Sequence, residues 1–344
     1  MRVPVVKALA VLAVPAVAVI LASSTSAARQ ASSDATAGAA QPDPAWKALR
    51  TPFGHPDIQG VWSFATYTPM ERPAQFAGKE YFTPEEAKAF YESAAERDYN
   101  ADPNVHYDPT EYGLDRWQNG ARPSLRTSQI IDPPDGRFPP LTPEAKEWLS
   151  RQSRERGLTP QSREIYERCI AGYWGRGLLN LTGGGGLDSE QEIVQTPSHI
   201  LIVSQSNNDL RIIPLDGRPH VSPGITPWFG DSRGRWEGGT LVVETTNFDP
   251  AVRYRGLPMK NVRVVERFTR VGPDALQYRL TAEDPTTWTR PWTAEVTWPK
   301  RPGPIFEFAC HEMNYGLVNV LRGELTAERN GTRQTRRPRA GGGD

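Results

Sequence analysis

The 344-residue sequence predicts a mainly β protein in which an antiparallel meander closes into a calycin-like barrel. Three observations favour this fold class. From residue 192 onward, apolar and polar residues alternate with the period of two that half-buried strands show. Turn motifs such as Asp216-Gly217 separate the alternating runs, and the 32 prolines and 10 tryptophans suit short strands joined by tight turns. Such a meander either closes into a barrel or stacks into two layers, so a β-sandwich is the alternative.

Residues 1–28 have the pattern of a secretory signal peptide. Arg2 and Lys7 form a basic start, residues 8–22 are an uncharged apolar run, and small residues follow. The run is short for a membrane span and lacks a basic flank on its far side. We therefore expect a periplasmic or secreted protein with no stable membrane insertion, in which a flexible leader over 29–45 follows the cleaved signal.

The remaining chain predicts a single β-rich domain over 46–325, followed by a disordered basic tail over 326–344. An N-terminal helical and loop insertion at about 83–168 belongs to this domain. Thr83 and Thr142 each precede Pro-Glu, which places an N-cap, a proline at the first helical position and an acid in the first turn.

These two motifs predict helices that begin at residues 83 and 142, the first ending at about residue 97, and residues 162–168 predict a third helix. The alternating pattern predicts strands over 58–64, 192–195, 199–204, 210–214, 240–248, 262–271, 276–283, 292–298 and 305–311.

Cys169 and Cys310 are the two cysteines of the chain. An even count in an oxidising compartment favours a disulfide, with two buried free thiols as the alternative. Closing so long a loop stabilises the fold by about 4–5 kcal/mol in the chain-entropy model. The two cysteines are far apart and form no Cys-x-x-Cys motif, so the sequence predicts no metal site.

The charge balance indicates the class of partner. Basic and acidic residues both number 40, and a formal net charge of zero argues against nucleic acid or an anionic membrane surface. The glycine-rich stretch at 181–187 lacks the Gly-Lys-Ser/Thr ending of a phosphate loop, and no Gly-x-Ser-x-Gly elbow is present. We expect a small-molecule ligand and no cofactor, with the oligomeric state left open.

Acidic residues recur in the apolar phase of several predicted strands. Glu266, for example, alternates with Val264 and Phe268, so it points to the same side as they do. A buried carboxylate needs an arginine, a hydroxyl or a ligand. We expect an interior polar cluster from Glu244, Glu266, Asp284 and Glu312, with Arg211, Arg218 and Arg267 as possible partners. A β-bulge that shifts the phase and turns the acids to water is the alternative.

Two histidines can pair with a carboxylate for proton transfer: His220 in a turn, and His311 beside Glu312. The predicted catalytic residues are Glu266, Asp284, His311 and Glu312. The predicted ligand-binding residues, which include tryptophans at likely rims of a cavity, are Arg211, His220, Trp228, Trp236, Glu244, Arg267 and Trp288.

Four segments resemble a group of secreted bacterial proteins that is known mainly as uncharacterised. They are residues 131–137 (IDPPDGR), 230–238 (GDSRGRWEG), 266–269 (ERFT) and 310–312 (CHE). The resemblance spans most of the chain and implies export and a β-rich fold, without an activity. Residues 60–62 (GVW) also match the lipocalin Gly-x-Trp motif, which adds only slight support for a barrel because the same pattern occurs elsewhere in the chain.

Two functions follow from these features. The first is a β-barrel protein that binds a small apolar, aromatic or sugar ligand, and the second is a hydrolase or lyase that uses a carboxylate and a histidine. Convergence of two acids and a histidine in one pocket favours the enzyme. If the acids do not converge, the site is to be sought in the loops between residues 100 and 140.

Overall fold

The computed structural model describes residues 46–99, 116–117, 119–155, 163, 165–171, 189–312 and 314–332. The predicted signal peptide (1–28), the leader (29–45), the glycine-rich stretch (181–187) and the end of the predicted tail (333–344) lie outside the described residues.

A ten-stranded antiparallel sheet dominates the fold, in the order β5-β4-β3-β1-β12-β11-β10-β7-β6, with β2 paired to β12. Strands make up 32% and helices 18% of the protein, so the prediction of a mainly β protein is confirmed. The strands of this sheet are β1 (Gly60–Ser63), β2 (Ile130–Asp132), β3 (Glu190–Gln195), β4 (His199–Ser204), β5 (Leu210–Pro214), β6 (Asp231–Glu237), β7 (Thr240–Thr246), β10 (Arg263–Gly272), β11 (Ala275–Glu283) and β12 (Trp292–Arg301), and a separate pair is formed by β8 (Arg253–Tyr254) and β9 (Leu257–Pro258).

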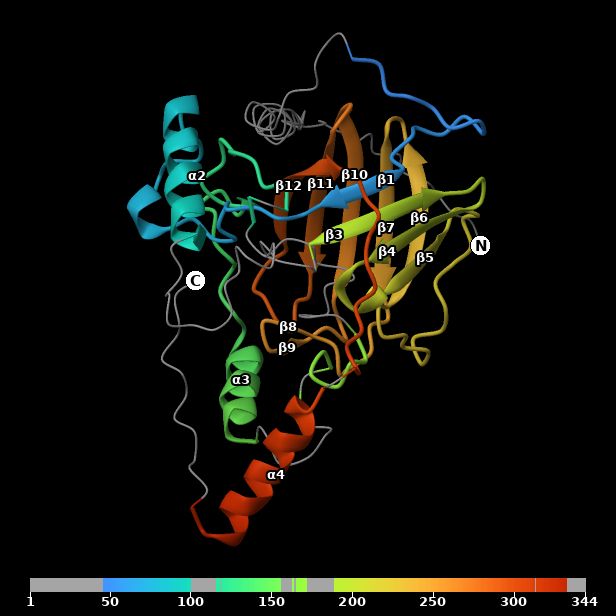
Figure 1. Cartoon of the computed structure of the whole chain (residues 1–344). Helices are drawn as coiled ribbons and strands as arrows, with labels where there is room; N and C mark the ends of the chain where they lie inside the picture. The colour runs from blue at the N-terminus through green and yellow to red at the C-terminus, as the bar shows by residue number, and fades with distance from the viewer. Residues whose placement is uncertain are drawn as a thin grey trace, which may run out of the picture. The chain divides into compact units, whose positions relative to one another are not determined.

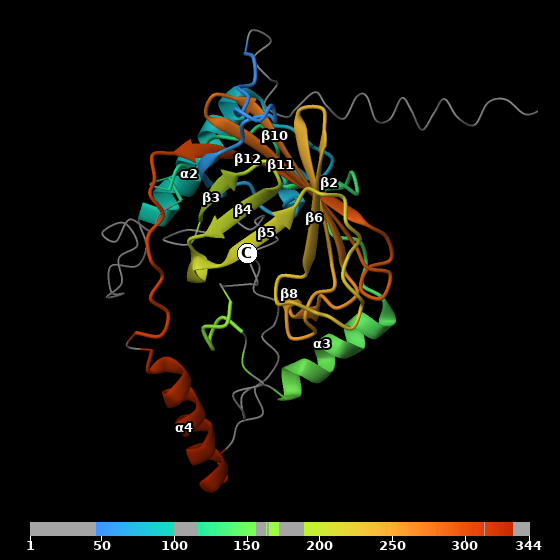
Figure 2. The same cartoon turned by 90° about the vertical axis from the view of Figure 1, so that its right-hand side faces the viewer.

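The sheet folds over itself into two layers. In Figure 1, β3, β4 and β5 cross in front of the layer that contains β10, β11 and β12, and in Figure 2, turned by 90°, they lie to the left. Rings fill the space between the layers: Trp62, Trp292 and Trp298 are fully buried, and Tyr278 stacks on Trp298 with ring centroids 4.5 Å apart. Burial of such rings is the main stabilising term for a two-layer β fold.

The predicted closure into a barrel is wrong. Cα atoms of the two edge strands β5 and β6 approach within 8 Å, but no hydrogen-bonded ladder joins them. The reason lies at Gly234 of β6, where an added Cβ would lie 2.9 Å from Cγ2 of Ile213 and 2.8 Å from Cδ2 of Leu215. Side chains from β5 and the residue after it therefore pack on the backbone of β6, which is the contact of two sandwich layers.

Most predicted strands are present, with ends shifted by a few residues, but the last one, at 305–311, is wrong. β12 ends at Arg301, and the chain beyond it is irregular, with Phe306 63% exposed. Its backbone is tied to Asn208 instead of to a strand: the Asn208 side chain donates to the Phe306 carbonyl oxygen and accepts from the Phe308 N–H. β2 and β6 were not predicted, because β2 is short and the Ser-Arg-Gly sequence of β6 resembles a turn.

The two Thr-Pro-Glu motifs begin helices α2 (Pro84–Tyr99) and α3 (Pro143–Glu155), as predicted. At the start of α2, the Glu86 N–H donates to Oγ1 of Thr83 at 3.2 Å, and the Thr83 N–H donates to Oε2 of Glu86 at 2.8 Å. This is a capping box, which satisfies two amides at the helix end. The side-chain hydrogen bond from Lys79, together with this backbone bond, lowers the pKa of Glu86.

The predicted third helix is wrong, because residues 165–169 form turns. A helix that was not predicted, α4 (Gly316–Arg329), extends over residues 326–329 of the predicted tail. Val318, Leu321 and Leu325 give α4 an apolar side, yet none of its residues is buried. Within the described ranges, no helix has both the length and the apolar character that crossing a membrane requires.

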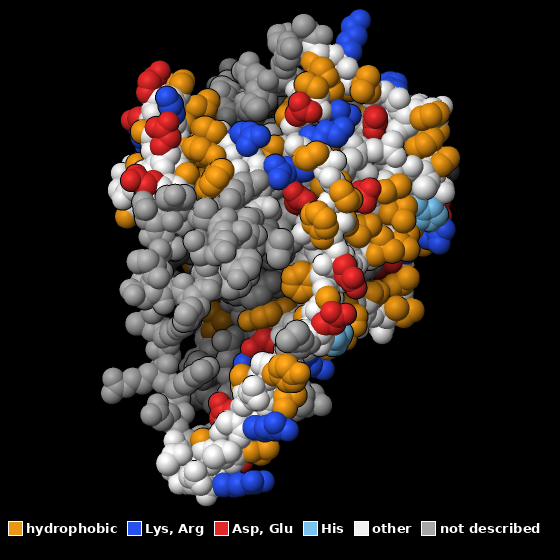
Figure 3. All heavy atoms as spheres, viewed as in Figure 1, with side chains coloured by type: hydrophobic (Ala, Val, Ile, Leu, Met, Phe, Trp, Pro, Cys, Tyr) orange, Lys and Arg blue, Asp and Glu red, His pale blue; other side chains and the backbone are white. Residues whose placement is uncertain are grey.

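The Cys169–Cys310 disulfide is present, with Cα atoms 5.7 Å apart, so this prediction is confirmed. It ties the turns at 165–171 to the irregular segment after β12. On the outer face of the smaller layer, Leu210 and Ile212 of β5 are 47% and 56% exposed, and Figure 3 shows hydrophobic side chains over β4 and β5.

Candidate functional site

The interior polar cluster predicted from strand phase exists around Glu266, which is fully buried. Arg211 of β5 donates from Nη1 to Oε1 at 3.1 Å and from Nη2 to Oε2 at 2.6 Å of the Glu266 carboxylate on β10. Arg211 also donates to the hydroxyls of Ser232 at 3.3 Å and Thr245 at 3.4 Å. One arginine thus connects β5, β6, β7 and β10, which holds the two layers together.

The Tyr278 hydroxyl donates to Oε1 of Glu266 at 2.9 Å and completes this cluster. Burial, and next the negative charge of Glu266, raise the pKa of Tyr278 well above 10.0. The prediction that Glu266 points inward with an arginine partner is therefore confirmed. Both carboxylate oxygens of Glu266 accept hydrogen bonds from Arg211, and one also accepts from Tyr278, which is the arrangement of a buried structural network.

The other predicted acids do not join it. Asp284 is buried, but its carboxylate accepts hydrogen bonds from Thr286 and Thr287 in the turn after β11. Glu244 lies on the outer face of β7, because Leu241 and Val243 occupy the inner phase. The interior position predicted for Glu244 is therefore wrong.

His311 and Glu312 are exposed, so their predicted inward position is also wrong. The phase inferred for them required a strand, and this segment forms none. The predicted catalytic set Glu266, Asp284, His311 and Glu312 thus combines two buried residues in different networks with two on the surface.

His220 and Glu244, both predicted to bind ligand, do meet on the outer face of β6 and β7. His220 Nδ1 lies 2.7 Å from Oδ2 of Asp231, and its Nε2 lies 3.4 Å from Oε1 of Glu244. Burial opposes ionisation of Glu244, but hydrogen bonding and charge from Arg263 hold its pKa below the usual value. Asp231 is likewise paired, with Arg233 at 2.7 Å. Within the described residues, no group of three or more His, Cys, Asp or Glu side chains could hold a metal ion.

The remaining predicted ligand residues are dispersed. Trp288 is 4% exposed and packs edge-on against Trp292 in the core, so it is not at a rim. Trp236 stacks on His55, with centroids 5.4 Å apart, and Trp228 is 38% exposed. Arg267 pairs with Glu237 at 2.7 Å on the outer face instead of reaching an interior acid. Arg218, a proposed partner for those acids, pairs with Asp216.

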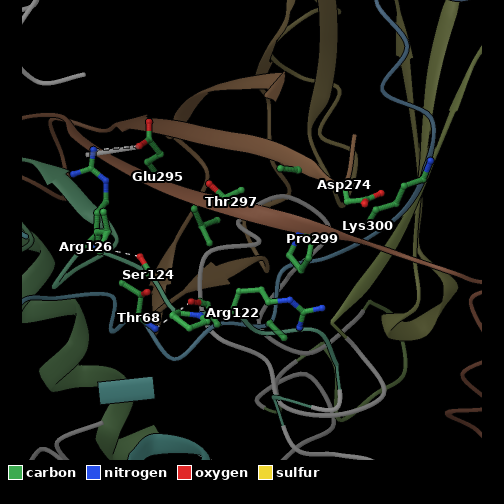
Figure 4. Close-up of a pocket in the computed structure, with 15 residues that line it drawn as sticks. Thr68, Arg122, Ser124, Arg126, Asp274, Glu295, Thr297, Pro299 and Lys300 are labelled. Atoms are coloured by element: carbon green, nitrogen blue, oxygen red, sulfur yellow. Dashed lines mark hydrogen bonds and ion pairs between the residues drawn. The ribbon is translucent and has the colours of Figure 1, made fainter. Parts of the chain in front are cut away.

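The structure contains a cleft elsewhere, on the outer face of β11 and β12, with a volume of about 620 Å³. We call it the outer cleft. Residues 65–68, just after β1, and residues 122–126, before β2, form its walls opposite the strands. Figure 4 shows Arg126 and Glu295 at one end, Asp274 and Lys300 at the other, and Arg122 between them. The lining residues are Ala65, Thr66, Thr68, Arg122, Pro123, Ser124, Leu125, Arg126, Asp274, Ala275, Glu295, Val296, Thr297, Pro299 and Lys300.

Glu295, at one end of the outer cleft, is shared by two arginines. Arg126 Nη2 donates to its Oε1 at 3.2 Å, and Arg279 donates to its Oε2 from Nε at 2.9 Å and from Nη2 at 2.6 Å. The side chains of Glu295 and Arg126 are only 3% and 7% exposed, so this pairing is held in a poorly solvated environment. Arg126 also donates from Nη1 to Oε1 of Glu80 at 3.3 Å, so the two guanidinium groups balance the charges of Glu295 and Glu80.

Arg122 is fixed in the middle of the outer cleft. Its Nη1 donates to the carbonyl oxygens of Gly120 at 3.0 Å and Ala121 at 3.1 Å. Lys300 lies at the Asp274 end of the outer cleft, with Nζ 5.9 Å from the centroid of the Trp62 ring. Three cationic side chains, two from the wall at 122–126 and one from β12, therefore line the outer cleft together with two acids, of which Glu295 is already neutralised.

The outer cleft could not be predicted from strand phase, because strand phase identifies only the side chains that face the core. The alternative region named from the sequence, residues 100–140, contains one of its walls. Glu295 could have been noticed as an acid in an apolar strand, in the phase opposite to Trp292 and Trp298. Its partner Arg126 could not have been inferred from any spacing.

No family model, curated protein or solved structure matches the chain. Function therefore has to be inferred from the side chains that the fold brings together.

Proposed function

We propose that the protein binds a small anion that carries hydroxyl groups, of which a sugar acid is the simplest example, in the outer cleft. The observation that carries this proposal is the excess of cationic side chains in a cleft of about 620 Å³. That volume lies in the range of small-molecule sites. Arg126 and Arg279 balance Glu295 and Glu80, so Arg122 and Lys300 leave the outer cleft with one positive charge more than Asp274 cancels, which favours a negative ligand.

The lining supports a sugar acid in three ways. Nη1 of Arg122 is engaged by two backbone carbonyls, and the edge formed by Nε and Nη2 suits a carboxylate, which accepts two parallel hydrogen bonds. The hydroxyls of Thr68, Ser124 and Thr297 can donate to or accept from ligand hydroxyls. Apolar atoms of Leu125 and its neighbours offer contact to the face of a pyranose ring. Of the predicted ligand classes, the sugar is thus favoured over a purely apolar or aromatic molecule.

The compartment proposed from the sequence, periplasmic or extracellular, agrees with the Cys169–Cys310 disulfide. Structural disulfides persist in oxidising compartments and are rare in a reducing cytosol. Sugar acids are abundant components of extracellular polysaccharides, so ligand class and compartment are consistent.

Calorimetric titration tests the proposal. Glucuronate and galacturonate are titrated at millimolar concentration and fixed ionic strength, with glucose and galactose as neutral counterparts. We expect heat of binding for the acids only, and about tenfold weaker binding for Arg122→Gln, the usual effect of losing one charged hydrogen bond. Arg235→Gln, on the outer face of β6 and paired with Glu237 at 2.7 Å, is the matched control. Absence of binding, or equal binding of the neutral sugars, would refute the proposal.

One observation favours a second function, hydrolysis or elimination at a sugar acid. His220, Asp231 and Glu244 converge, as acid–base chemistry requires. Both acids are however paired with arginines, and none of the three residues lines the outer cleft. The binding function is therefore preferred. Release of new reducing ends from an acidic polysaccharide by the wild type, but not by His220→Ala, would reverse this preference.

A further inference from the structure

A second cleft adjoins the outer cleft. It has a volume of about 660 Å³, and Thr66 and Thr68 line both clefts. The two spaces therefore lie on either side of the same short segment after β1, and we call the second one the side cleft. A ligand bound at Thr66 and Thr68 contacts residues of both.

The side cleft is more strongly cationic than the outer cleft. Arg72, Arg97, Arg116 and Arg137 line it, and Glu71 is the acid among its lining residues. Glu71 is already engaged, because its Oε1 accepts the Phe138 N–H at 3.1 Å and its Oε2 lies 3.9 Å from Nη2 of Arg255. Even without Arg116, the three cations Arg72, Arg97 and Arg137 outnumber the one acid that lines the side cleft.

One of these arginines is built into the fold, and two lie at the surface. Arg72 is 5% exposed, and its guanidinium donates to Oγ1 of Thr127 and to the Pro134 carbonyl oxygen, both at 3.0 Å. Arg97 and Arg137, which also line the side cleft, are exposed. A fixed inner cation with outer cations around it suits a ligand that bears more than one negative charge.

Aromatic side chains accompany these cations. Tyr67 and Phe90 line the side cleft, and the guanidinium of Arg116 lies 5.5 Å from the centroid of the Tyr67 ring. Alternation of guanidinium groups with ring surfaces matches the alternation of carboxylates with apolar ring faces along an acidic sugar chain. A nucleic acid also carries repeated charges, but the zero net charge of the protein disfavours it.

We propose that the outer cleft and the side cleft form one continuous site for an acidic oligosaccharide, with neighbouring sugar residues bound on the two sides of Thr66 and Thr68. This inference rests on the proposed function of the outer cleft and adds the length of the ligand. Linked subsites strengthen binding because the second contact forms within the same complex. Affinity should then increase with chain length until both clefts are filled.

The test is a calorimetric series of galacturonate oligomers from one to four residues at fixed ionic strength. We expect the tetramer to bind at least about tenfold more tightly than the monomer. In the double variant Arg97→Gln/Arg137→Gln, which alters only exposed positions, the tetramer should weaken by about tenfold while the monomer changes little. Arg122→Gln should weaken both ligands, and Arg235→Gln should weaken neither.

Each failure has its own meaning. Equal affinity for monomer and tetramer, or an unchanged tetramer affinity in the double variant, would overturn the continuous site and leave the outer cleft as a monomer site. Lack of binding by every oligomer would overturn the proposed function itself. A single-stranded DNA of equal charge that binds as tightly as the tetramer would overturn the assignment to acidic sugars. Retention of the wild-type melting temperature by the double variant checks that folding is unaffected.

Discussion

Arg211 and Glu266 form a doubly hydrogen-bonded ion pair across the interior, although their strands β5 and β10 are not neighbours in the sheet. Both side chains are almost completely inaccessible, at 3% and 0% exposure. Since β5 is the last strand of one layer, the pair forms a polar connection between that layer and the other. The pair therefore holds the layer that ends in β5 against the layer that contains β10.

Replacing Glu266 by Gln should therefore affect folding. The change leaves the buried guanidinium of Arg211 without its counter-charge, and loss of one partner of a buried pair costs about 3–5 kcal/mol in the free energy of unfolding. Urea denaturation followed by tryptophan fluorescence measures this. The matched control is Arg211→Met combined with Glu266→Gln, which removes both charges and should recover most of the loss. A stable single variant with altered ligand binding would instead indicate a functional role.

Alkaline pH should destabilise the fold through Tyr278. Below pH 10.0 the Tyr278 hydroxyl is protonated in both the folded and the unfolded chain, so the free energy of unfolding does not depend on pH through this group. Above that pH the unfolded tyrosine ionises, while burial and the charge of Glu266 keep the folded one protonated. The folded state then binds more protons, so the free energy of unfolding falls as pH rises.

The measurement is tyrosinate absorbance followed together with circular dichroism as pH is raised. Tyr278, and Tyr254, whose pKa is also raised by burial, should ionise only as the fold is lost. Tyr315→Phe, at a 67% exposed position, should leave the unfolding transition in place. Ionisation of every tyrosine before any change in circular dichroism would contradict the burial of these hydroxyls.

The interior pair illustrates what sequence periodicity can predict. β10 alternates regularly from Val264 to Phe268, which are both fully buried, and Glu266 between them must share their side. The same argument failed for Glu312. Alternation in a short apolar segment indicates a strand only if a neighbouring strand is available to pair with it, and the segment after β12 has none in the described part of the chain.

Sequence periodicity could not predict the outer cleft. It is assembled from segments that begin at residues 65, 122, 274 and 295, and periodicity does not tell which loop covers the outer face of a sheet. The ion pair between Arg126 and Glu295 spans 169 positions in the sequence. Only the folded chain reveals that the loop before β2 lies over β12.

Gly234→Val should test the close approach of β5 and β6. A Cβ at this position would lie under 3.0 Å from the ends of the Ile213 and Leu215 side chains, and valine adds two more methyl groups. Overpacking of this kind costs about 1–3 kcal/mol in the free energy of unfolding. Gly239→Val is the control, since an added Cβ there meets nothing within 4 Å. Equal stability of the two variants in urea would contradict the contact between the layers.

Reduction of the Cys169–Cys310 disulfide should destabilise the fold without abolishing the outer cleft. The bond closes a loop of 141 residues, and chain entropy alone makes such a closure worth about 4–5 kcal/mol. The double variant Cys169→Ser/Cys310→Ser should therefore unfold at lower urea concentration. Because neither cysteine lines the outer cleft, the folded variant should still bind galacturonate with wild-type affinity. Loss of that binding, with retention of the native circular dichroism, would place the ligand site near the disulfide instead.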